Sequence, residues 1–257
     1  MQKSTGCVVS SRASNALVWA ATAPVLLALA PAAAVAQSRS ILEVSATTDE
    51  RRHGLSWSDG RASASARVDL QLGGLDTSAR LSALRGSARH TGADLVTDLT
   101  LGKAWDLAGM RVRVSAIGHL FTGASEQMDY GEVGAGASYT LGPLQVDAGA
   151  NFAPDQKAIG GSNLYMFAGA AAGIPATPVT VFTSVGRSLG EDGATRSDRL
   201  RPGGDYTDWR IGADYVLGQL TVGLDYTGTQ LQNRSVGTIG DRRNSGDRLL
   251  ARVQLNL

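Results

Sequence analysis

Apolar and polar residues alternate with a period of two along most of the chain beyond residue 40. From 220 to 226 the even positions carry leucine, valine, leucine and tyrosine, whereas the odd positions carry threonine, glycine and aspartate. The same alternation runs through 62–72, 144–154 and 247–257. Alternation over ten or more residues is typical of a β-strand with one apolar face, and it is long for a soluble protein. The pattern therefore predicts long strands with an apolar side and a polar side.

The segments between the predicted strands alternate in length. Short turns at 73–74, 108–109, 142–143, 175–178 and 218–219 alternate with longer, polar loops at 49–61, 86–92, 122–128, 155–162, 190–204 and 232–246. This asymmetry is typical of an outer-membrane barrel with short periplasmic turns and long extracellular loops. The sequence thus predicts an all-β, closed antiparallel transmembrane β-barrel. Its twelve expected strands are 41–48, 62–72, 75–85, 93–107, 110–121, 129–142, 144–154, 163–175, 179–189, 205–218, 220–231 and 247–257.

A closed barrel satisfies every backbone polar group without water, because its first and last strands pair with each other. A secreted soluble β-sandwich is the alternative architecture, since its strands also alternate. Strands of about eleven residues, their even number and the two loop lengths favour the barrel.

The first 36 residues have the pattern of a targeting segment. Lys3 and Arg12 precede an almost wholly apolar run at 16–34, and Ala-Val-Ala at 34–36 is a small-x-small cleavage site. We expect residues 1–36 to be a cleaved signal peptide for Sec-dependent export and residues 37–257 to be the barrel. Loss of Lys3 and Arg12 would change the formal charge from +1 to −1.

Composition excludes several classes of protein. A single Cys and three His provide too few ligands for a structural metal or a disulfide framework. The near balance of 24 Lys+Arg and 23 Asp+Glu provides no basic surface for nucleic acid. We expect no cofactor, no metal site and no nucleic-acid partner.

Three segments at the predicted loop ends suggest a family. They are TDERRHGLSWSDG at 48–60, DYGEV at 129–133 and DYTDW at 205–209. In this order they resemble the TorF family of porins, and the resemblance covers roughly residues 41–257. It implies an outer-membrane barrel of a Gram-negative bacterium, without naming a solute.

Candidate catalytic groups are few. His53 and His90 fall in predicted loops, and His119 lies on a polar strand face near a loop end, so a Ser-His-Asp arrangement is disfavoured. Asp94 and Asp98 lie four residues apart on one face. They could form a carboxylate pair or hold a divalent cation, although lumen carboxylates paired with arginines are the more ordinary interpretation. We therefore expect no enzyme and no catalytic residue.

The charged residues of the polar strand faces are the candidate lumen lining. Charges cancel on the first five strands and the last, whereas strands six to eleven carry an excess of three carboxylates. A mildly negative lumen would favour cations, and Asp214 and Asp225 are the expected dominant carboxylates unless each pairs with an arginine. The candidates are Arg67, Asp69, Arg80, Asp94, Asp98, Arg111, Arg113, Glu132, Asp147, Arg210, Asp214, Asp225, Arg248 and Arg252.

Two functions remain open at this point. The first is a channel for passive diffusion of small hydrophilic solutes or ions. The second is a closed structural, adhesive or enzymatic barrel that acts through its extracellular loops. The mixed charges of loops 49–61 and 190–204 indicate a solvated rim. The expected partners are outer-membrane lipid and lipopolysaccharide, the barrel-assembly machinery and the small solutes.

Overall fold

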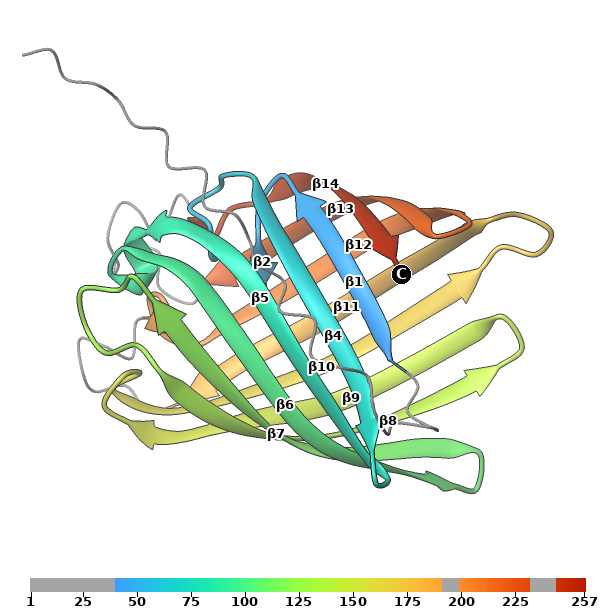
Figure 1. Cartoon of the computed structure of the whole chain (residues 1–257), viewed down its shortest axis with the longest axis horizontal. Helices are drawn as coiled ribbons and strands as arrows, with labels where there is room; N and C mark the ends of the chain where they lie inside the picture. Colours follow the sequence, from blue (N-terminus) through green and yellow to red (C-terminus); the bar gives the residue numbers. More distant parts are fainter. Residues whose placement is uncertain (1–39, 191–198, 232–243) are drawn as a thin grey trace, which may run out of the picture. The chain divides into compact units, whose positions relative to one another are not determined.

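Twelve strands form one closed antiparallel barrel in the computed structural model, which describes residues 40–190, 199–231 and 244–257 (Figure 1). The predicted signal segment 1–36 lies outside the described residues. The barrel strands are β1 (Ile41–Thr47), β4 (Ser63–Leu72), β5 (Leu75–Ser87), β6 (Ala93–Leu107), β7 (Met110–Thr122), β8 (Tyr130–Leu141), β9 (Leu144–Gln156), β10 (Gly161–Gly173), β11 (Val179–Gly190), β12 (Tyr206–Leu217), β13 (Leu220–Leu231) and β14 (Arg248–Asn256).

The barrel closes by pairing its first and last strands. β1 pairs with β4 on one side and with β14 on the other, and Ala46 lies opposite Val253 in the closing pair. Every other barrel strand pairs with its neighbours in the sequence. Closure leaves no unpaired sheet edge. The predicted closed antiparallel barrel with twelve strands is confirmed.

The period of two in the sequence separates an outer from an inner face. Leu224 and Tyr226 are 54% and 44% exposed on the outside, whereas the intervening Asp225 is 3% exposed. Large apolar side chains on the other strands, such as Val133 and Leu249, are exposed in the same way. The charged residues of the alternate positions point into the lumen, so the sheet is apolar toward its surroundings and polar within.

Short turns lie together at one end of the barrel (Figure 1). At 73–74 and 108–109 both residues of the turn have positive φ, with Ala108 at 51° and Gly109 at 83°. Two positive φ values give the backbone the twist that joins adjacent antiparallel strands. These turns hold their hairpins in register.

The opposite end differs from the prediction in two places. The loop expected at 155–162 is the four-residue turn 157–160, because β9 and β10 extend farther and the backbone N–H groups of Ile159 and Gly160 bond to Gln156. The first loop contains a two-stranded hairpin that the alternation did not predict, β2 (Arg51–Arg52) and β3 (Leu55–Ser56). The connection between β5 and β6 contains a short 3-10 helix, η1 (Ala88–His90). In the described ranges, no helix has the length and apolar character needed to cross a bilayer.

Candidate functional site: the lumen and its inward-folded loop

Most of the first loop is buried, which contradicts its interpretation as a solvated rim. Asp49 and Glu50 are 2% and 4% exposed, and Leu55 and Trp57 are buried as well. Arg199, in the described part of loop 190–204, is also buried. These charges are not solvated because the segments that carry them pack against the barrel interior and against one another.

Buried side-chain hydrogen bonds hold the hairpin in shape. Ser56 and Ser58 both donate to Oδ1 of Asp49, at 2.5 and 3.0 Å. The backbone N–H of Trp57 donates to the carbonyl of Glu50 at 2.7 Å. Burial raises the pKa of the Asp49 carboxyl despite these hydroxyls. These bonds within the loop fix the position of β3 relative to Asp49 and Glu50.

Arg52 joins the hairpin to the barrel wall. Its guanidinium lies 2.8 Å from Oδ2 of Asp98 on β6 and donates to Ser82 of β5 at 3.2 Å. The same side chain contacts Glu50 at 3.2 Å and lies 4.2 Å from the ring centre of Trp57. A buried guanidinium requires such partners, because desolvation would otherwise be costly.

The tip of the hairpin reaches the opposite wall. The ring of His53 stacks on Tyr165 of β10 at a centroid distance of 3.6 Å, and Thr229 of β13 donates to the carbonyl of Gly54 at 2.8 Å. A Cβ at position 54 would lie 2.5 Å from Cβ of Asp208, and φ there is +72°, so the tip requires glycine. Burial lowers the pKa of His53 to about 4, and the ring is therefore neutral at pH 7.

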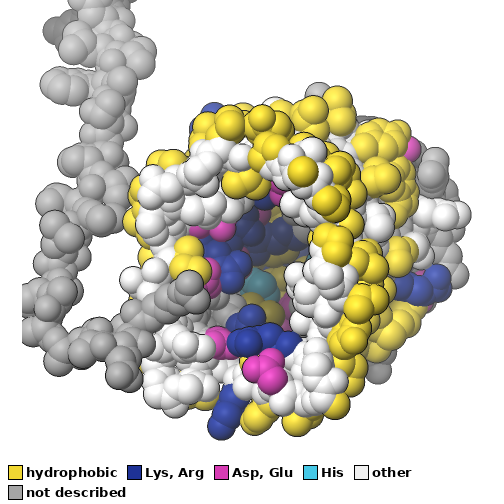
Figure 2. All heavy atoms as spheres, turned by 90° about the vertical axis from the view of Figure 1, so that its right-hand side faces the viewer, with side chains coloured by type: hydrophobic (Ala, Val, Ile, Leu, Met, Phe, Trp, Pro, Cys, Tyr) yellow, Lys and Arg dark blue, Asp and Glu magenta, His cyan; other side chains and the backbone are white. Residues whose placement is uncertain are grey.

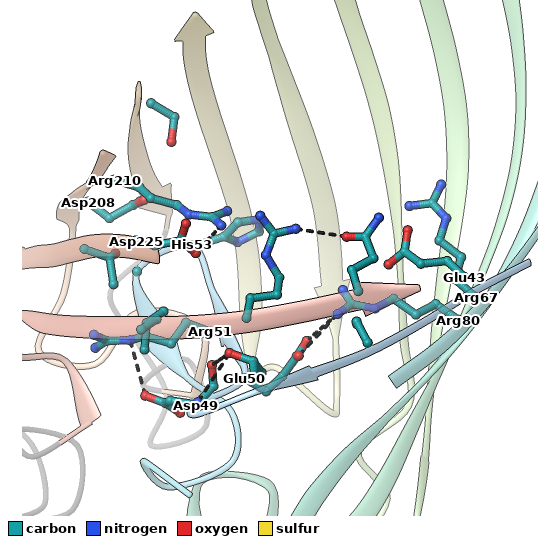
Figure 3. A pocket seen from close by; sticks show the side chains of 18 of the residues that line it. Glu43, Asp49, Glu50, Arg51, His53, Arg67, Arg80, Asp208, Arg210 and Asp225 are labelled. Carbon is teal, nitrogen blue, oxygen red and sulfur yellow. Dashed lines mark hydrogen bonds and ion pairs between the residues drawn. The ribbon is translucent and has the colours of Figure 1, made fainter. Parts of the chain in front are cut away.

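The hairpin contributes to the walls of two cavities in the lumen, one of about 410 Å³ and one of about 510 Å³. His53, Arg67 and Arg80 line both. In the smaller cavity Arg51 points toward Asp49 and Arg80 points toward Glu50 (Figure 3). Arg67 and Arg80 start from directly opposite positions of β4 and β5. Seen from the short-turn end, the barrel is hollow and its interior carries basic and acidic side chains (Figure 2).

The structure places the predicted lumen residues mainly on these walls. The smaller cavity is lined by Arg67, Arg80, Arg210, Asp225 and Arg252, and the larger by Arg67, Arg80, Asp98, Arg113 and Glu132. Asp147 lies beside Gly169, where an added Cβ would be 2.9 Å from its Oδ1.

Most of these charges are paired. Asp225 pairs with Arg210, and Asp214 pairs with Arg252 at 2.8 Å, so arginines neutralise both carboxylates expected to dominate the lumen. The further pairs are Arg67 with Asp69 at 2.8 Å, Arg111 with Asp106 at 3.8 Å and with Asp76 at 3.9 Å, and Arg248 with Asp49 at 3.9 Å.

Asp94 and Asp98 do not act as a pair. Asp98 is engaged by Arg52 and by His119, whose Nδ1 lies 2.8 Å from its Oδ1. Asp94 is exposed near the loop end, where its carboxylate lies against Gly123. The other nitrogen of His119 faces Glu132 at 3.8 Å. His119 therefore lies between two carboxylates, and the contacts of its ring among the described residues include no serine hydroxyl.

Arg199 connects several loops at the long-loop end of the barrel. It donates to the carbonyls of Met128 and Ala158, at 2.8 and 3.1 Å, and lies 4.4 Å from the ring centre of Phe121. It also donates to Nδ1 of His90 at 3.3 Å, which makes that nitrogen the acceptor of a neutral imidazole. Burial and the neighbouring Arg199 hold the pKa of His90 well below its usual range.

Three features were not predicted from the sequence: the hairpin, the contact of His53 with Tyr165 and the contacts of Arg199. A signal for the hairpin was present, since Leu55 and Trp57 are large apolar residues within a charged loop. No local pattern marks Arg199, because its partners come from three other loops or strand ends.

Comparison with solved structures places the barrel among known folds. An outer membrane channel from Pseudomonas putida F1 superposes with a TM-score of 0.51 at 10% identity, over 84% of this chain and 94% of that chain. The anion-selective porin from Comamonas acidovorans has a TM-score of 0.39 at 10% identity, covering 86% of this chain and 98% of its own. LpxR from Salmonella typhimurium has a TM-score of 0.43 at 10% identity, over 84% of this chain and 99% of LpxR. At such identities the likeness concerns the fold alone.

A search of curated proteins gave no match to this sequence. A family model described as "Bacterial protein of unknown function (Gcw_chp)" matches residues 36–254, which is nearly the whole described barrel. The chain therefore belongs to the Gcw_chp family of bacterial proteins.

Proposed function

We propose that this protein is an outer-membrane channel for passive diffusion of small hydrophilic solutes or ions, and that its first loop narrows the lumen. One observation carries the proposal: a closed barrel of twelve strands has an apolar outer face and an interior lined with charged residues. The likeness to the Pseudomonas putida channel and the resemblance to TorF-family porins support it. No catalytic residue is assigned.

Placement in the outer membrane follows from the two faces of the sheet. Exposed leucine, valine and aromatic side chains such as Leu141, Val133 and Trp105 would be unfavourable in water over so large an area. Residues 1–36 would direct export through the Sec pathway and be removed.

The placement in the outer membrane can be tested on isolated membranes. The membranes are washed with urea, and boiled and unboiled samples are compared on a gel. We expect retention in the membrane with a heat-dependent mobility shift, whereas release without a shift would contradict this placement.

A water-filled lumen is favoured by the cost of burying charge. The interior holds many ion pairs, and pairs without water repay their desolvation poorly. The cavities of about 410 and 510 Å³ are large enough for several waters and lie beside these pairs. Liposome swelling with neutral sugars of increasing size measures the usable width. We expect monosaccharides to enter faster than trisaccharides, because the hairpin occupies part of the lumen.

The proposed channel has a weak preference for cations, which rests on other carboxylates than the sequence suggested. Asp214 and Asp225 are neutralised by arginines, but Glu43 and Asp147 have no arginine partner among the described residues. These two carboxylates, rather than the paired ones, would outweigh the unpartnered Arg113 of the same lumen and set the sign of its field.

One observation favours a closed barrel as the second candidate. Two apolar clusters tie the loops to the wall at the long-loop end. Phe121 packs against both, one built around Trp57 and Leu84 and the other around Tyr130 and Ile159. If these clusters closed the long-loop end, the lumen would open only at the short-turn end. Sugar entry into liposomes distinguishes the two candidates, because a closed barrel would give none.

A further inference from the structure

Arg113 lies on the wall of the larger cavity without a partner. It belongs to β7 and faces the lumen opposite Gly136 of β8. The described residues provide no hydrogen bond or ion pair for its guanidinium, and its Nε is fully buried. A charged group in this position is costly unless something neutralises it.

Gly102 of β6 makes the space that the guanidinium occupies. A Cβ at position 102 would lie 2.9 Å from Nε of Arg113 and 3.1 Å from its Nη2. Any other residue there would displace the arginine side chain. The glycine therefore leaves the guanidinium seated against the wall and facing the cavity.

Two more arginines share this cavity. Arg67 of β4 and Arg80 of β5 lie directly opposite each other in the register of the two strands. Like charges in that relation destabilise a sheet. Arg67 contacts Asp69 and Arg80 contacts Glu50, yet their side chains remain 40% and 33% exposed. Both thus keep donors available to the lumen.

The charge of the cavity is unbalanced. Arg52, Arg67, Arg80 and Arg113 line it, against the carboxylates Asp98 and Glu132. The oxygens of Asp98 already accept from Arg52 and His119, and Glu132 faces His119. The smaller cavity, in contrast, is lined by five arginines and five carboxylates. Arg52, Arg67 and Arg80 have carboxylate partners, so Arg113 is the guanidinium of this wall for which an anion in the cavity would supply the missing partner.

Ile117, Tyr130 and Phe167 form an apolar part of the same wall. A volume of about 510 Å³ lies within the range of small-molecule sites. Basic donors beside an apolar surface select a ligand with an anionic head and a compact apolar body. Inorganic phosphate has the charge but would leave the apolar surface unused.

We propose that the larger cavity is a binding site for small organic carboxylates, with the carboxylate held by Arg113, Arg67 and Arg80 and the apolar body against Ile117 and Phe167. The ligand enters from the hollow short-turn end of the barrel (Figure 2). The site deepens the proposed channel function by naming a solute class that it retains. Binding itself does not require that the lumen conduct.

Isothermal titration calorimetry of the refolded full barrel in detergent micelles, with benzoate as the probe, tests the site. We expect saturable binding that weakens in high salt. Arg113→Gln should lower the affinity roughly 10- to 100-fold, the range for a lost hydrogen bond to a charged group. Arg111→Gln is the matched control, because Arg111 lies on the same strand face but pairs with Asp106 and does not line the cavity. Its affinity should be unchanged.

Three results would overturn the proposal: no benzoate binding by the wild type, equal affinity in Arg113→Gln, or binding of inorganic phosphate or neutral benzamide as tight as that of benzoate. Heat-dependent gel mobility shows whether each variant is folded. Arg113→Lys keeps the positive charge and should therefore retain part of the affinity for benzoate. Because calorimetry needs no ion flow, benzoate binding without conductance would contradict the channel and leave this site standing.

Discussion

Arg52 and Asp98 are separated by 46 residues in the sequence, and their side chains meet inside the barrel with Nη2 and Oδ2 2.8 Å apart. This pair connects the hairpin of the first loop to β6. Both side chains are largely buried, at 13% and 12% exposure. The contact holds the loop against β6 inside the barrel.

Asp98→Asn should release the hairpin. Removing one member of a buried ion pair leaves the other uncompensated, at a cost of about 3 kcal/mol or more. Trypsin should then cleave after Arg51 or Arg52 much faster than in the wild type, while the heat-dependent mobility of the barrel is kept. Asp69→Asn is the control, since its partner Arg67 belongs to the wall. Equal cleavage of all three proteins would show that the pair does not hold the loop.

Acid should release the same hairpin through His53. Docked, its pKa is about 4, whereas a solvated histidine titrates near 6.5. Below pH 6.5 the released form therefore binds a proton that the docked form does not, and docking weakens until about pH 4. The loss reaches ~3 kcal/mol, at about 1.4 kcal/mol per pH unit.

Trypsin and acid-active proteases applied between pH 7 and pH 4 would follow this release. Cleavage of the hairpin should rise as the pH falls, and His53→Gln should have a much flatter profile because it removes the titrating group. An unchanged acid response in His53→Gln would exclude this histidine as the cause.

The assignment of inner and outer faces predicts opposite responses to a new charge. Leu224 points outward and Ser78 lines the larger cavity. Leu224→Arg should cost ~2–4 kcal/mol in the free energy of unfolding, as expected for arginine facing lipid near mid-membrane. Ser78→Arg should cost far less. Urea titrations in lipid vesicles measure both, and similar costs would mean that the faces are misassigned.

The barrel itself could be predicted because its physics is local. Alternation with a period of two follows directly from strand geometry, so a reader of the sequence can count the strands and assign each face. Asp225 and Leu224 illustrate this, since both lie where the alternation places them. The turn chemistry at 73–74 and 108–109 was equally visible.

The hairpin and the charge pairs could not be predicted in the same way. Whether Glu50 and Arg52 face solvent or the lumen depends on partners such as Asp98 and Ser82, which are distant in the sequence. Pairing across the lumen, as between Asp214 and Arg252, depends on strand register and tilt rather than on composition. For the same reason the lack of a partner for Arg113 among the described residues could not be predicted from the sequence.

Removing the carboxylates of two lumen ion pairs should shift the ion selectivity of the channel toward anions. Asp214→Asn combined with Asp225→Asn frees Arg252 and Arg210 from their partners, so the lumen gains two uncompensated positive charges. Reversal potentials across a KCl gradient should then shift toward anions, most strongly in dilute salt. Asp147→Asn, which frees no arginine, should produce a smaller shift of the same sign. No shift in the double variant would contradict a conducting path along these residues.

Single-channel recording in planar bilayers tests the proposed channel most directly. The refolded wild type should give discrete, reproducible conductance steps in KCl. A variant in which residues 51–58 are replaced by a short Gly-Ser linker should give larger steps, because the hairpin that occupies the lumen is removed. Barrels that insert into the bilayer but remain silent in both forms would contradict the channel and favour the closed barrel.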